Sequence, residues 1–458
     1  MAGLRVALVR PRCDCPDPEF QEPLGAEAIC GYLREKNIRC EVFDRLLGVT
    51  ASDIDAFQPD FIGFSLMTNA DVPDALRLRQ ILGRGGRRFF AGGLFVTTCP
   101  EQARALFPAD TALISGEGEG PVLELVTAGR PLGRLFPSPD EWAFASRDRL
   151  DEYLARGGVI NIRASRGCRG ACAFCTTPRA GRPMRHQTRS VEKIADEMQR
   201  LIQAGHPAVF NFTDDMFGDH TRIEALERTL SERNLRAAFT LEMRAQEVAK
   251  TPVDLWPALH AGGLCRVFTG LESLNPDTLA AWNKTVPIPE LKDALKVLRA
   301  CGIACEVGYI LWHQETTPQS AWEEAEALHE LSLLSPKSAL SRLVLYPGSL
   351  LHARMQADGV ALCPLGPGAQ RQFRRWEALL MELRQLWYSA SCVHPKMVCD
   401  AFLSAACVGP LRALEACLER IRDLTYQTLR EDREPDETEL QTIRGELLAL
   451  HSAAAGRR

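Results

Sequence analysis

Short apolar runs alternate with segments of helical period along most of this 458-residue chain, and this alternation restricts the folds that it can adopt. Within residues 1–128 the apolar runs are LRVALV, RCEVFD, DFIGFSL, RFFAGG and TALISGEG, with helical segments such as GAEAICGYLREK between them. Strands that alternate with helices form a parallel sheet that is covered by helices. We therefore predict a doubly wound, Rossmann-like α/β domain for residues 1–128.

A second alternating series follows a segment that is rich in proline and glycine. The run TAGRPLGRLFPSPDEW interrupts the periodicity, so we predict a linker for residues 129–155. The next apolar runs are GVINIRAS, AVFNFT, AAFTLEM, CRVFTGLES, ACEVGYIL and ALSRLVLY. These six strand–helix units predict a partial (β/α)6 barrel over residues 156–360, with its ligands at the carboxyl ends of the strands. Residues 361–458 have helical patterns and are expected to form a helical C-terminal domain.

Composition excludes several classes of function. The net charge of −5 disfavours a broad nucleic-acid surface, which needs an excess of basic residues. No apolar run reaches the roughly 18 residues of a membrane span. The N-terminal run MAGLRVALVRP is too short for a signal peptide and fits a first strand better. With 16 cysteines and no secretion signal, we expect a protein of the reducing cytoplasm.

Three cysteines lie close together in the segment CRGACAFC, at Cys168, Cys172 and Cys175. A structural zinc site needs four ligands, and a redox Cys-x-x-Cys pair needs only two. Three thiolates on a [4Fe–4S] cluster leave one iron open for a substrate or cofactor, and glycines beside the cysteines give the loop its freedom to turn. The spacing therefore favours a [4Fe–4S] cluster, with a structural or zinc site as the alternative.

The run RASRGCRGACAFCTTP resembles the signature of the radical S-adenosylmethionine (SAM) superfamily, in which an aromatic residue precedes the last cysteine. The resemblance covers roughly residues 156–358. It implies that the open iron binds the amino and carboxylate groups of SAM. One electron then cleaves SAM, and a 5′-deoxyadenosyl radical takes hydrogen from the substrate. It further implies that Phe174 lies against the adenine and that a flavodoxin, a ferredoxin or another partner reductase supplies the electron.

Further residues of this resemblance follow the predicted strands. In FNFTDDMF, Asp214 and Asp215 are candidates for the methionine amine, although either could instead cap the next helix. In TLEMRAQE, Arg244 could hold the methionine carboxylate. The run GLESLNPDTLAAWNK resembles a fourth-strand pattern of the family, in which Glu272 and Ser273 would reach the ribose hydroxyls.

The N-terminal domain resembles the cobalamin-binding fold that precedes the radical SAM barrel in one large subclass. The runs SLM, GG and SGEGE match, but the cobalt-ligand motif D-x-H-x-x-G does not. In FDRLLG, Asp44 is in place and Leu46 stands where the histidine would be. A leucine cannot ligate cobalt. Either cobalamin binds without a protein ligand below the cobalt, or the domain has lost the cofactor.

Acidic residues inside the predicted barrel suggest a substrate. Glu306 lies within an apolar strand and needs a partner, which a cationic substrate such as an amino sugar would supply; a salt bridge to a barrel arginine is the alternative. Glu306, His313 and Glu242 are our candidates for acid–base catalysis. For His313 the alternative is a packed loop histidine.

Size and layout resemble the radical SAM dehydratases of aminoglycoside biosynthesis. We therefore predict hydrogen abstraction and loss of water from a small amino-sugar-like metabolite, in the biosynthesis of an antibiotic. The alternative is a cobalamin-dependent radical SAM C-methyltransferase. An iron–sulfur carrier would not need the barrel residues, and an RNA-modifying relative would need further N-terminal cysteines and a C-terminal RNA-binding barrel. Neither nucleic acid nor membrane is therefore expected as a partner.

Overall fold

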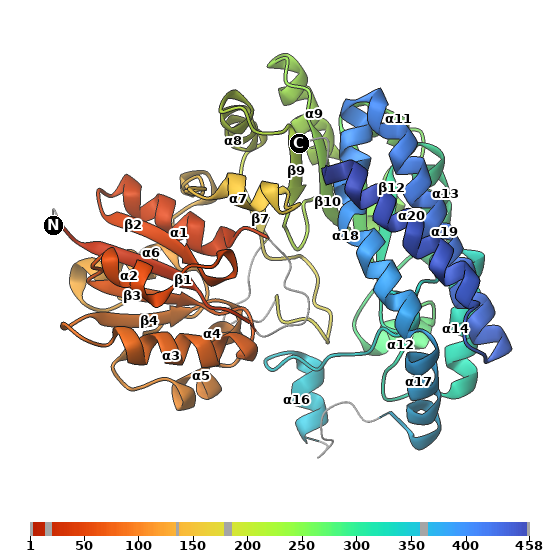
Figure 1. Ribbon diagram of the computed structural model, residues 1–458, viewed down its shortest axis with the longest axis horizontal. Helices are drawn as coiled ribbons and strands as arrows, with labels where there is room; N and C mark the ends of the chain where they lie inside the picture. Colours follow the sequence, from red (N-terminus) through yellow and green to blue (C-terminus); the bar gives the residue numbers. More distant parts are fainter. Residues whose placement is uncertain (1–2, 14–20, 134–136, 178–185, 358–364, 456–458) are drawn as a thin grey trace.

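The computed structural model describes residues 3–13, 21–133, 137–177, 186–357 and 365–455. They form an N-terminal sheet domain, a central sheet domain and a layer of C-terminal helices (Figure 1). The predicted boundary at residue 360 lies outside the described residues. Of the helices that these ranges contain, none combines the length and the apolar character needed to cross a bilayer.

The N-terminal domain contains a five-stranded parallel sheet in the order β2-β1-β3-β4-β5. Its strands are β1 (Arg5–Arg10), β2 (Arg39–Asp44), β3 (Phe61–Ser65), β4 (Arg88–Gly92) and β5 (Thr111–Leu113). The helices are α1 (Leu24–Glu35), α2 (Ala51–Ala56), α3 (Val72–Leu82), α4 (Leu94–Thr98), α5 (Pro100–Leu106) and α6 (Glu119–Ala128).

Both faces of this sheet are buried because each strand alternates its apolar side chains between two cores. Along β1, Val6 and Leu8 pack with residues of α1 and α6. Ala7 and Val9 point the other way and pack with residues of α2, α3, α4 and α5. This two-sided packing confirms the predicted doubly wound architecture.

The predicted linker carries structure of its own. It contains a 3-10 turn, η3 (Pro139–Glu141), and the helix α7 (Leu150–Ala155). Trp142 and Tyr153 are buried, at 4% and 1% exposure. The hydroxyl of Tyr153 donates a hydrogen bond to Asp44 at the end of β2. The segment is therefore packed between the two sheet domains (Figure 1).

The central domain is an open, parallel sheet in the order β12-β11-β10-β9-β6. Its strands are β6 (Ile160–Ile162), β9 (Val209–Phe212), β10 (Ala238–Arg244), β11 (Leu264–Glu272) and β12 (Ala304–Tyr309). A small antiparallel pair, β7 (Ser165–Arg166) and β8 (Gln187–Thr188), stands beside it.

The predicted sixth strand, ALSRLVLY, makes only one bridge, between Trp312 and Arg342. Pro347 and Gly348 end this segment, and its apolar Val344 and Tyr346 are more than half exposed instead of being packed. A strand needs continuous pairing along one side, and here the pairing stops after one residue. The described part of the domain is therefore a five-stranded partial barrel.

The outer face of the central sheet is covered by helices that share one large core with it. Phe210, Phe239 and Leu241 of the strands contribute to this core. The helices are α8 (Val191–Gln203), α9 (His220–Glu232), α10 (Ala245–Lys250), α11 (Trp256–Ala261), α13 (Ile288–Ala300), α14 (Pro318–Glu330) and α15 (Pro336–Ala339). Two further helices of this domain are α12 (Pro276–Ala281) and α16 (Leu350–Ala357), and Leu351 and Met355 of α16 pack with Ala173 in a smaller separate core.

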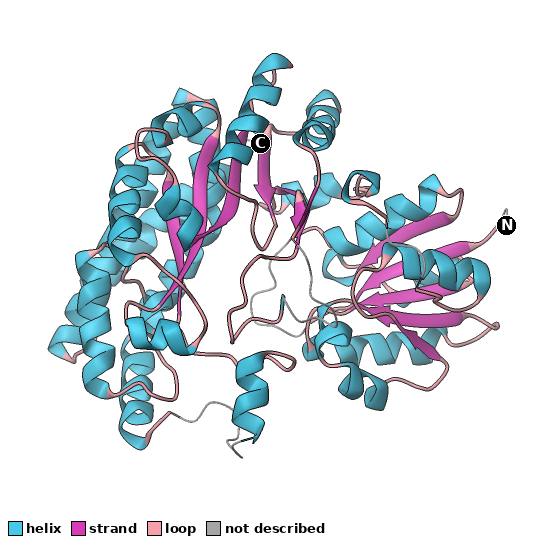
Figure 2. Ribbon diagram, turned by 180° about the vertical axis from the view of Figure 1, so that it is seen from behind, coloured by secondary structure: helices cyan, strands magenta, loops and turns pink. Residues whose placement is uncertain are grey.

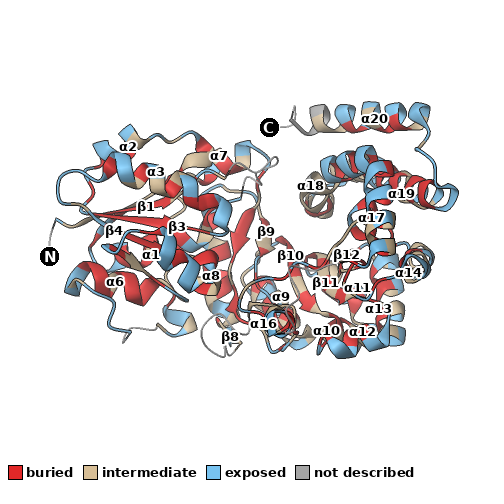
Figure 3. Ribbon diagram, turned by 90° about the horizontal axis from the view of Figure 1, so that it is seen from below, coloured by how far each residue is buried: buried red, intermediate tan, exposed pale blue. Residues whose placement is uncertain are grey.

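The C-terminal helices close the opposite face of that sheet. They are α17 (Pro367–Leu379), α18 (Met381–Leu403), α19 (Val408–Glu431) and α20 (Glu437–Ala455). Val398 and Cys399 of α18 pack against Val209, Ala238 and Cys265, which lie near the start of three strands. Helix α18 therefore covers the amino ends of the strands, and α19 and α20 pack beyond it (Figure 3). The carboxyl ends remain for ligands.

Candidate active site

The two sheet domains share one cavity of about 400 Å³. The N-terminal strands end toward the central domain (Figure 2), and Ser65, Gly92 and Gly116 line the cavity just after strands β3, β4 and β5. From the central domain it is lined by Arg163, Ser165, Arg166, Gly167, Thr176, Thr177, Thr213 and Asp215. The segment from residue 163 to 177 contains the three cysteines. The cavity therefore connects the N-terminal sheet with the cysteine loop.

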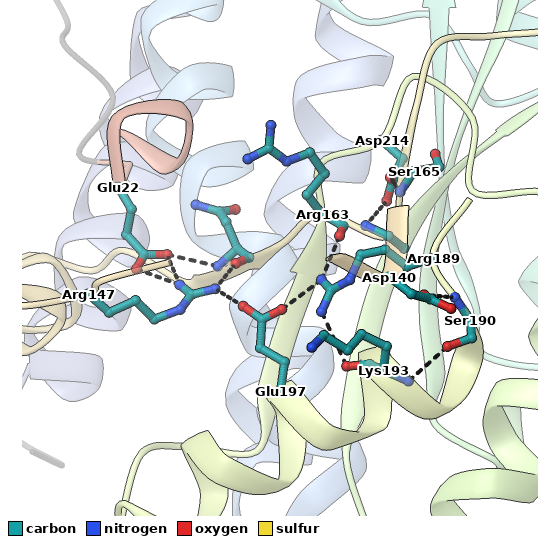
Figure 4. A network of polar contacts seen from close by, with 12 residues as sticks. Glu22, Asp140, Arg147, Arg163, Ser165, Arg189, Ser190, Lys193, Glu197 and Asp214 are labelled. Atoms are coloured by element: carbon teal, nitrogen blue, oxygen red, sulfur yellow. Dashed lines mark hydrogen bonds and ion pairs between the residues drawn. The ribbon is translucent and has the colours of Figure 1, made fainter. Parts of the chain in front are cut away.

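Buried ion pairs fix the two domains relative to each other (Figure 4). Arg147 of the linker segment binds Glu22 of the N-terminal domain at 2.6 Å and Glu197 of α8 at 3.0 Å. Glu197 also binds Arg189 at 2.7 Å. These arginines hold the pKa of the buried Glu197 carboxyl below its usual value, against the effect of burial. The cavity is therefore bounded by domains whose contact is charged and desolvated.

The cysteine loop turns sharply after β7. Gly167 has φ +79°, a left-handed conformation that glycine adopts without strain. The backbone N–H of Gly170 donates to Sγ of Cys168 at 3.3 Å. A side chain at Gly170 would meet both this sulfur and the guanidinium carbon of Arg244, each at 3.4 Å. Arg244 therefore lies directly against the cysteine loop.

Two segments from the other side of the barrel hold the middle of this loop. The N–H of Ala173 donates to the carbonyl of Trp282 at 2.7 Å, and the carbonyl of Ala173 accepts from Leu351 at 2.7 Å. The amide of Asn283 donates to the carbonyl of Ala171 at 2.9 Å. The positions of the cysteines therefore depend on contacts from α12 and α16.

The two predicted amine-binding carboxylates differ in position. Asp215 lines the cavity, where it accepts from the hydroxyl of Thr177 at 3.2 Å. Asp214 is buried and accepts from the backbone N–H groups of Ala164 and Ser165. Burial raises the pKa of Asp214 to about 6. Asp214 therefore fixes the backbone at β7, and of the pair only Asp215 is open to a ligand.

The two residues predicted for the ribose also differ. Glu272 has φ +69°, uncommon for a residue with a side chain, and its carboxylate pairs with Lys284 at 3.5 Å. Glycine at positions 270 and 308 leaves room for this carboxylate. Ser273 is completely buried, and its hydroxyl donates to Glu324 at 3.3 Å. The structure thus gives Ser273 an internal partner, because the helix α14 brings Glu324 against it.

Phe174 and His313 belong to one row of rings. Trp282 lies 5.6 Å from the ring of Phe174 and 5.1 Å from that of His313, edge to face in both cases. His313 is 5% exposed, and burial lowers its pKa to about 4. It is therefore neutral at pH 7 and packed behind Trp282. This burial and lowered pKa favour the alternative, a packed loop histidine, over the predicted catalytic acid or base.

Glu242 of β10 and Glu306 of β12 lie level with each other on the inner face of the sheet, one on each side of β11, but they have opposite surroundings. Glu306 pairs with Arg266 and with Lys337, the latter at 2.6 Å, and these cations lower its pKa to about 2 against the effect of burial. The carboxylate of Glu242 has neither a hydrogen bond nor an ion pair to any residue that the structure describes. Burial and the nearby Asp215 raise its pKa to about 7. Of these two glutamates, only Glu242 can exchange a proton near neutral pH.

The structure corrects the position expected for a cobalt ligand. Asp44 ends the edge strand β2, where it accepts from Arg10 at 2.9 Å and from Tyr153. Neither Asp44 nor Leu46 is among the described residues that line the cavity. Of the first two strands, β1 contributes Leu8 to the described lining of the cavity and β2 contributes no residue. The first histidine of the chain is His186, so the N-terminal domain can supply none.

Two stretches of the chain match known families. Residues 162–325 match the Radical SAM superfamily, and residues 18–126 match the B12 binding domain. This chain contains a radical SAM domain and, before it, a B12-binding domain. Radical SAM proteins use a [4Fe–4S] cluster and SAM, as the cysteine loop predicted.

Curated relatives resemble this radical SAM protein over both domains. An uncharacterized methyltransferase of Pyrococcus horikoshii is 28% identical over 67% of this chain and 72% of the relative. The anaerobic magnesium-protoporphyrin IX monomethyl ester cyclase of Rubrivivax gelatinosus is 25% identical over 70% of this chain. The hopanoid C-3 methylase of Methylococcus capsulatus is 24% identical over 64% of it. The chain spans less than two thirds of the last two, at 64% and 62%.

Solved structures share the fold of the whole chain. The cobalamin-dependent SAM radical enzyme OxsB superposes with a TM-score of 0.72 over 98% of this chain and 76% of OxsB, at 18% identity. The radical SAM methyltransferase TsrM from Kitasatospora setae superposes with a TM-score of 0.62 over 80% of this chain and 79% of TsrM, also at 18% identity. These matches confirm the predicted order of sheet domain, radical SAM domain and C-terminal helices.

The residues of the N-terminal domain fit a large ligand such as cobalamin. The cavity enters a slot between α1 and α6 that is lined by Ala26, Ile29, Phe90 and Val122. At its rim, Gly93 has φ +101°, and a side chain there would lie 2.4 Å from the carbonyl oxygen of Leu66. Glycines at the rim let a ligand approach the backbone closely. The slot is apolar, which suits the aromatic base in the nucleotide tail of cobalamin.

The cysteine loop is arranged for an iron–sulfur cluster and not for a single metal ion. Within the described residues, no three His, Cys, Asp or Glu side chains gather around one point as a single metal ion would require. In a [4Fe–4S] cluster each cysteine binds a different iron, so the thiolates surround a cube. Cys168, Cys172 and Cys175 are half-buried on one loop. Burial raises the pKa of Cys172, whereas the nearby Lys284 and Arg244 favour its thiolate.

Sequence reasoning missed two cations at this site. Lys284 ends the motif GLESLNPDTLAAWNK, and its contact with Glu272 depends on the fold of α12. Arg163 comes directly after β6 and lines the cavity. The rule that ligands lie at the carboxyl ends of parallel strands would have selected Arg163.

Proposed function

We propose that this radical SAM protein transfers a methyl group to a carbon atom of a small molecule with the help of cobalamin. The observation that carries the proposal is the shared cavity, in which the N-terminal slot and the cysteine loop meet. A cofactor in the slot and SAM at the loop would both face this cavity. Two of the curated relatives named above are a methyltransferase and a methylase, which supports the same reaction.

When bound, the cluster and SAM supply a 5′-deoxyadenosyl radical, and cobalamin supplies a methyl group. Arg244 would bind the carboxylate of SAM, because its guanidinium lies against Gly170 and has no ion pair to the described residues. Asp215 is the candidate for the amine, and Glu272 with its Lys284 partner for the ribose. Phe174, held by Trp282, would pack against the adenine.

Glu242 is the group that can hold or move a proton in this site. Its pKa of about 7 leaves the carboxyl partly protonated at neutral pH. An Oε atom of Glu242 could donate a hydrogen bond to a substrate hydroxyl or carbonyl, or accept a proton from it. We propose that Glu242 orients the substrate in the barrel.

The original amino-sugar prediction loses its main support. It relied on Glu306 needing a cation from the substrate, and Arg266 and Lys337 already provide two. His313, the other proposed acid or base, is neutral and packed. The substrate therefore remains a small molecule whose charge the barrel does not specify, and a cytoplasmic location with a flavodoxin or ferredoxin as electron donor stays part of the proposal.

The proposal is tested without knowledge of the substrate. The chain is reconstituted with iron and sulfide, reduced, and incubated with SAM in the presence or absence of cobalamin. We expect S-adenosylhomocysteine to form only with cobalamin, because loss of the methyl group from SAM requires an acceptor. Formation of 5′-deoxyadenosine without S-adenosylhomocysteine in the cobalamin-loaded protein would contradict methyl transfer and return attention to dehydration.

A further inference from the structure

Arg163 differs from the other arginines at the contact between the domains. Its guanidinium has neither a hydrogen bond nor an ion pair to any residue in the described ranges. Arg147, Arg166 and Arg189 are each paired with buried or half-buried glutamates. The side chain of Arg163 turns away from the Glu197–Arg189 pair (Figure 4) and lines the cavity. Arg163 is thus a cation at the mouth of the slot that has no partner among the described residues.

The neighbouring carboxylates do not neutralise Arg163, because other groups already bind them. Glu119 pairs with Arg166, and Asp214 accepts from backbone N–H groups. Burial and the like charge of Arg166 lower the pKa of Arg163 to about 10. A desolvated cation is costly unless an anion compensates it. The position of Arg163 therefore favours an anionic ligand.

The shape of the cavity indicates what carries the anion. From Arg163 it continues between the first turns of α1 and α6 into the apolar slot on the sheet, where Gly63 and Phe90 form the floor. The free N–H groups at the start of a helix favour a negative charge. The cavity thus suits a ligand with a flat apolar group followed directly by an anion.

We propose that Arg163 binds the phosphodiester in the nucleotide tail of cobalamin. In that tail an aromatic base is attached to a ribose, and a single negative phosphodiester joins the ribose to the linker of the corrin. An apolar base followed by an anion is the arrangement that the slot and its mouth fit. The inference rests on cobalamin binding in the proposed function, but not on methyl transfer. Arg244, not Arg163, lies against the cysteine loop, so the SAM carboxylate has its own partner.

The test compares two corrinoids that differ in the tail. Cobinamide has the corrin of cobalamin but lacks the phosphodiester and the nucleotide. Dissociation constants of both are measured by quenching of tryptophan fluorescence in the full-length chain. A charge-assisted hydrogen bond contributes a factor of about ten to a hundred to the affinity. We therefore expect Arg163→Met to weaken cobalamin binding by at least about tenfold. Cobinamide binding should stay within about twofold of the wild type.

Two further variants make the result specific. Arg163→Lys keeps the charge and should lose less affinity for cobalamin than Arg163→Met does. Arg130→Met removes an exposed arginine at the far end of α6 and should change neither constant. Thermal unfolding checks that each variant is folded.

Several outcomes would overturn the inference. Equal losses for both corrinoids, or no loss for either, would exclude a contact with the phosphodiester. Weaker binding of SAM with unchanged cobalamin binding would assign Arg163 to SAM. A wild type that binds neither corrinoid would instead remove cobalamin from the proposed function, which distinguishes the two failures.

Discussion

At the scale of single residues, the barrel places two glutamates with opposite titration behaviour on β10 and β12, the two strands that flank β11. The pKa of Glu242 is raised to about 7 and that of Glu306 is lowered to about 2. The difference comes from partners, because Glu306 has two cations and Glu242 faces Asp215. One site can therefore hold both a permanent anion and an exchangeable proton.

The raised pKa of Glu242 predicts a pH-dependent stability. The folded protein holds this proton more tightly than the unfolded chain, in which the pKa is near 4.5. The resulting stability is complete below about pH 4.5 and is lost as the pH rises toward 7. Glu242→Gln removes the ionisation. At about pH 8 we expect the free energy of unfolding of this variant to exceed that of the wild type by roughly 2 kcal/mol, so that it unfolds at a higher temperature. Near pH 5 the two proteins should unfold at a similar temperature.

The comparison is made by thermal unfolding of both proteins across this pH range. Glu306→Gln serves as the control, because removing a paired anion should destabilise the protein at both pH values. Equal unfolding temperatures of wild type and Glu242→Gln at both pH values would show that Glu242 ionises normally.

The sequence points most directly to site residues whose predicted role depends on local spacing. The three cysteines and Arg244 follow from a motif and from strand periodicity. His313, Ser273 and Glu306 could not be judged in this way. His313 packs against Trp282, Ser273 donates to Glu324, and Glu306 pairs with Lys337. Each of these partners is distant in the sequence. Burial and pairing across the fold are invisible to local patterns.

At the scale of elements, the carboxyl ends of the strands carry the site, and Trp282 holds the cysteine loop through Ala173 and Phe174. We call these contacts of Trp282 the clamp. Alternation of apolar and polar residues predicted five strands of the central sheet correctly, since each is held by neighbours on the sheet. It failed for ALSRLVLY, because its pairing with the loop after β12 is limited to one bridge. Trp282 contributes both its carbonyl, to Ala173, and its ring, to Phe174.

The clamp predicts that Trp282 is needed to retain the cluster. Trp282 is 2% exposed, so Trp282→Ala leaves a large cavity beside the loop and costs about 3–5 kcal/mol. We expect a lower iron content after reconstitution and faster loss of the cluster's visible absorbance. Trp322→Ala is the matched control, because Trp322 stacks on Tyr426 in the outer helices, away from the loop. Equal iron retention in the two variants would contradict the clamp.

At the scale of the whole molecule, the function depends on two domains that present the ends of their strands to one cavity. The sequence predicted each domain from its own alternation, but it could not predict how they meet. The contact is made by Glu22, Arg147 and Glu197, which are separated by long stretches of chain and show no common pattern. Even the proline-rich linker, expected as a loose connection, is buried at Trp142 and Tyr153.

This contact gives a prediction about the assembled protein. Arg147→Met would leave the carboxylates of Glu22 and Glu197 buried without their shared cation, at a cost of about 3–5 kcal/mol. The domains should then separate more often and expose residues 129–155. We expect faster proteolytic cleavage in that segment and weaker cobalamin binding, because the cavity needs both walls. Arg149→Met is the control, since its partner Glu152 is largely exposed and the pair contributes little. If both variants are cleaved at the wild-type rate, the ion pairs do not hold the domains together, and packing of the linker alone must fix the cavity.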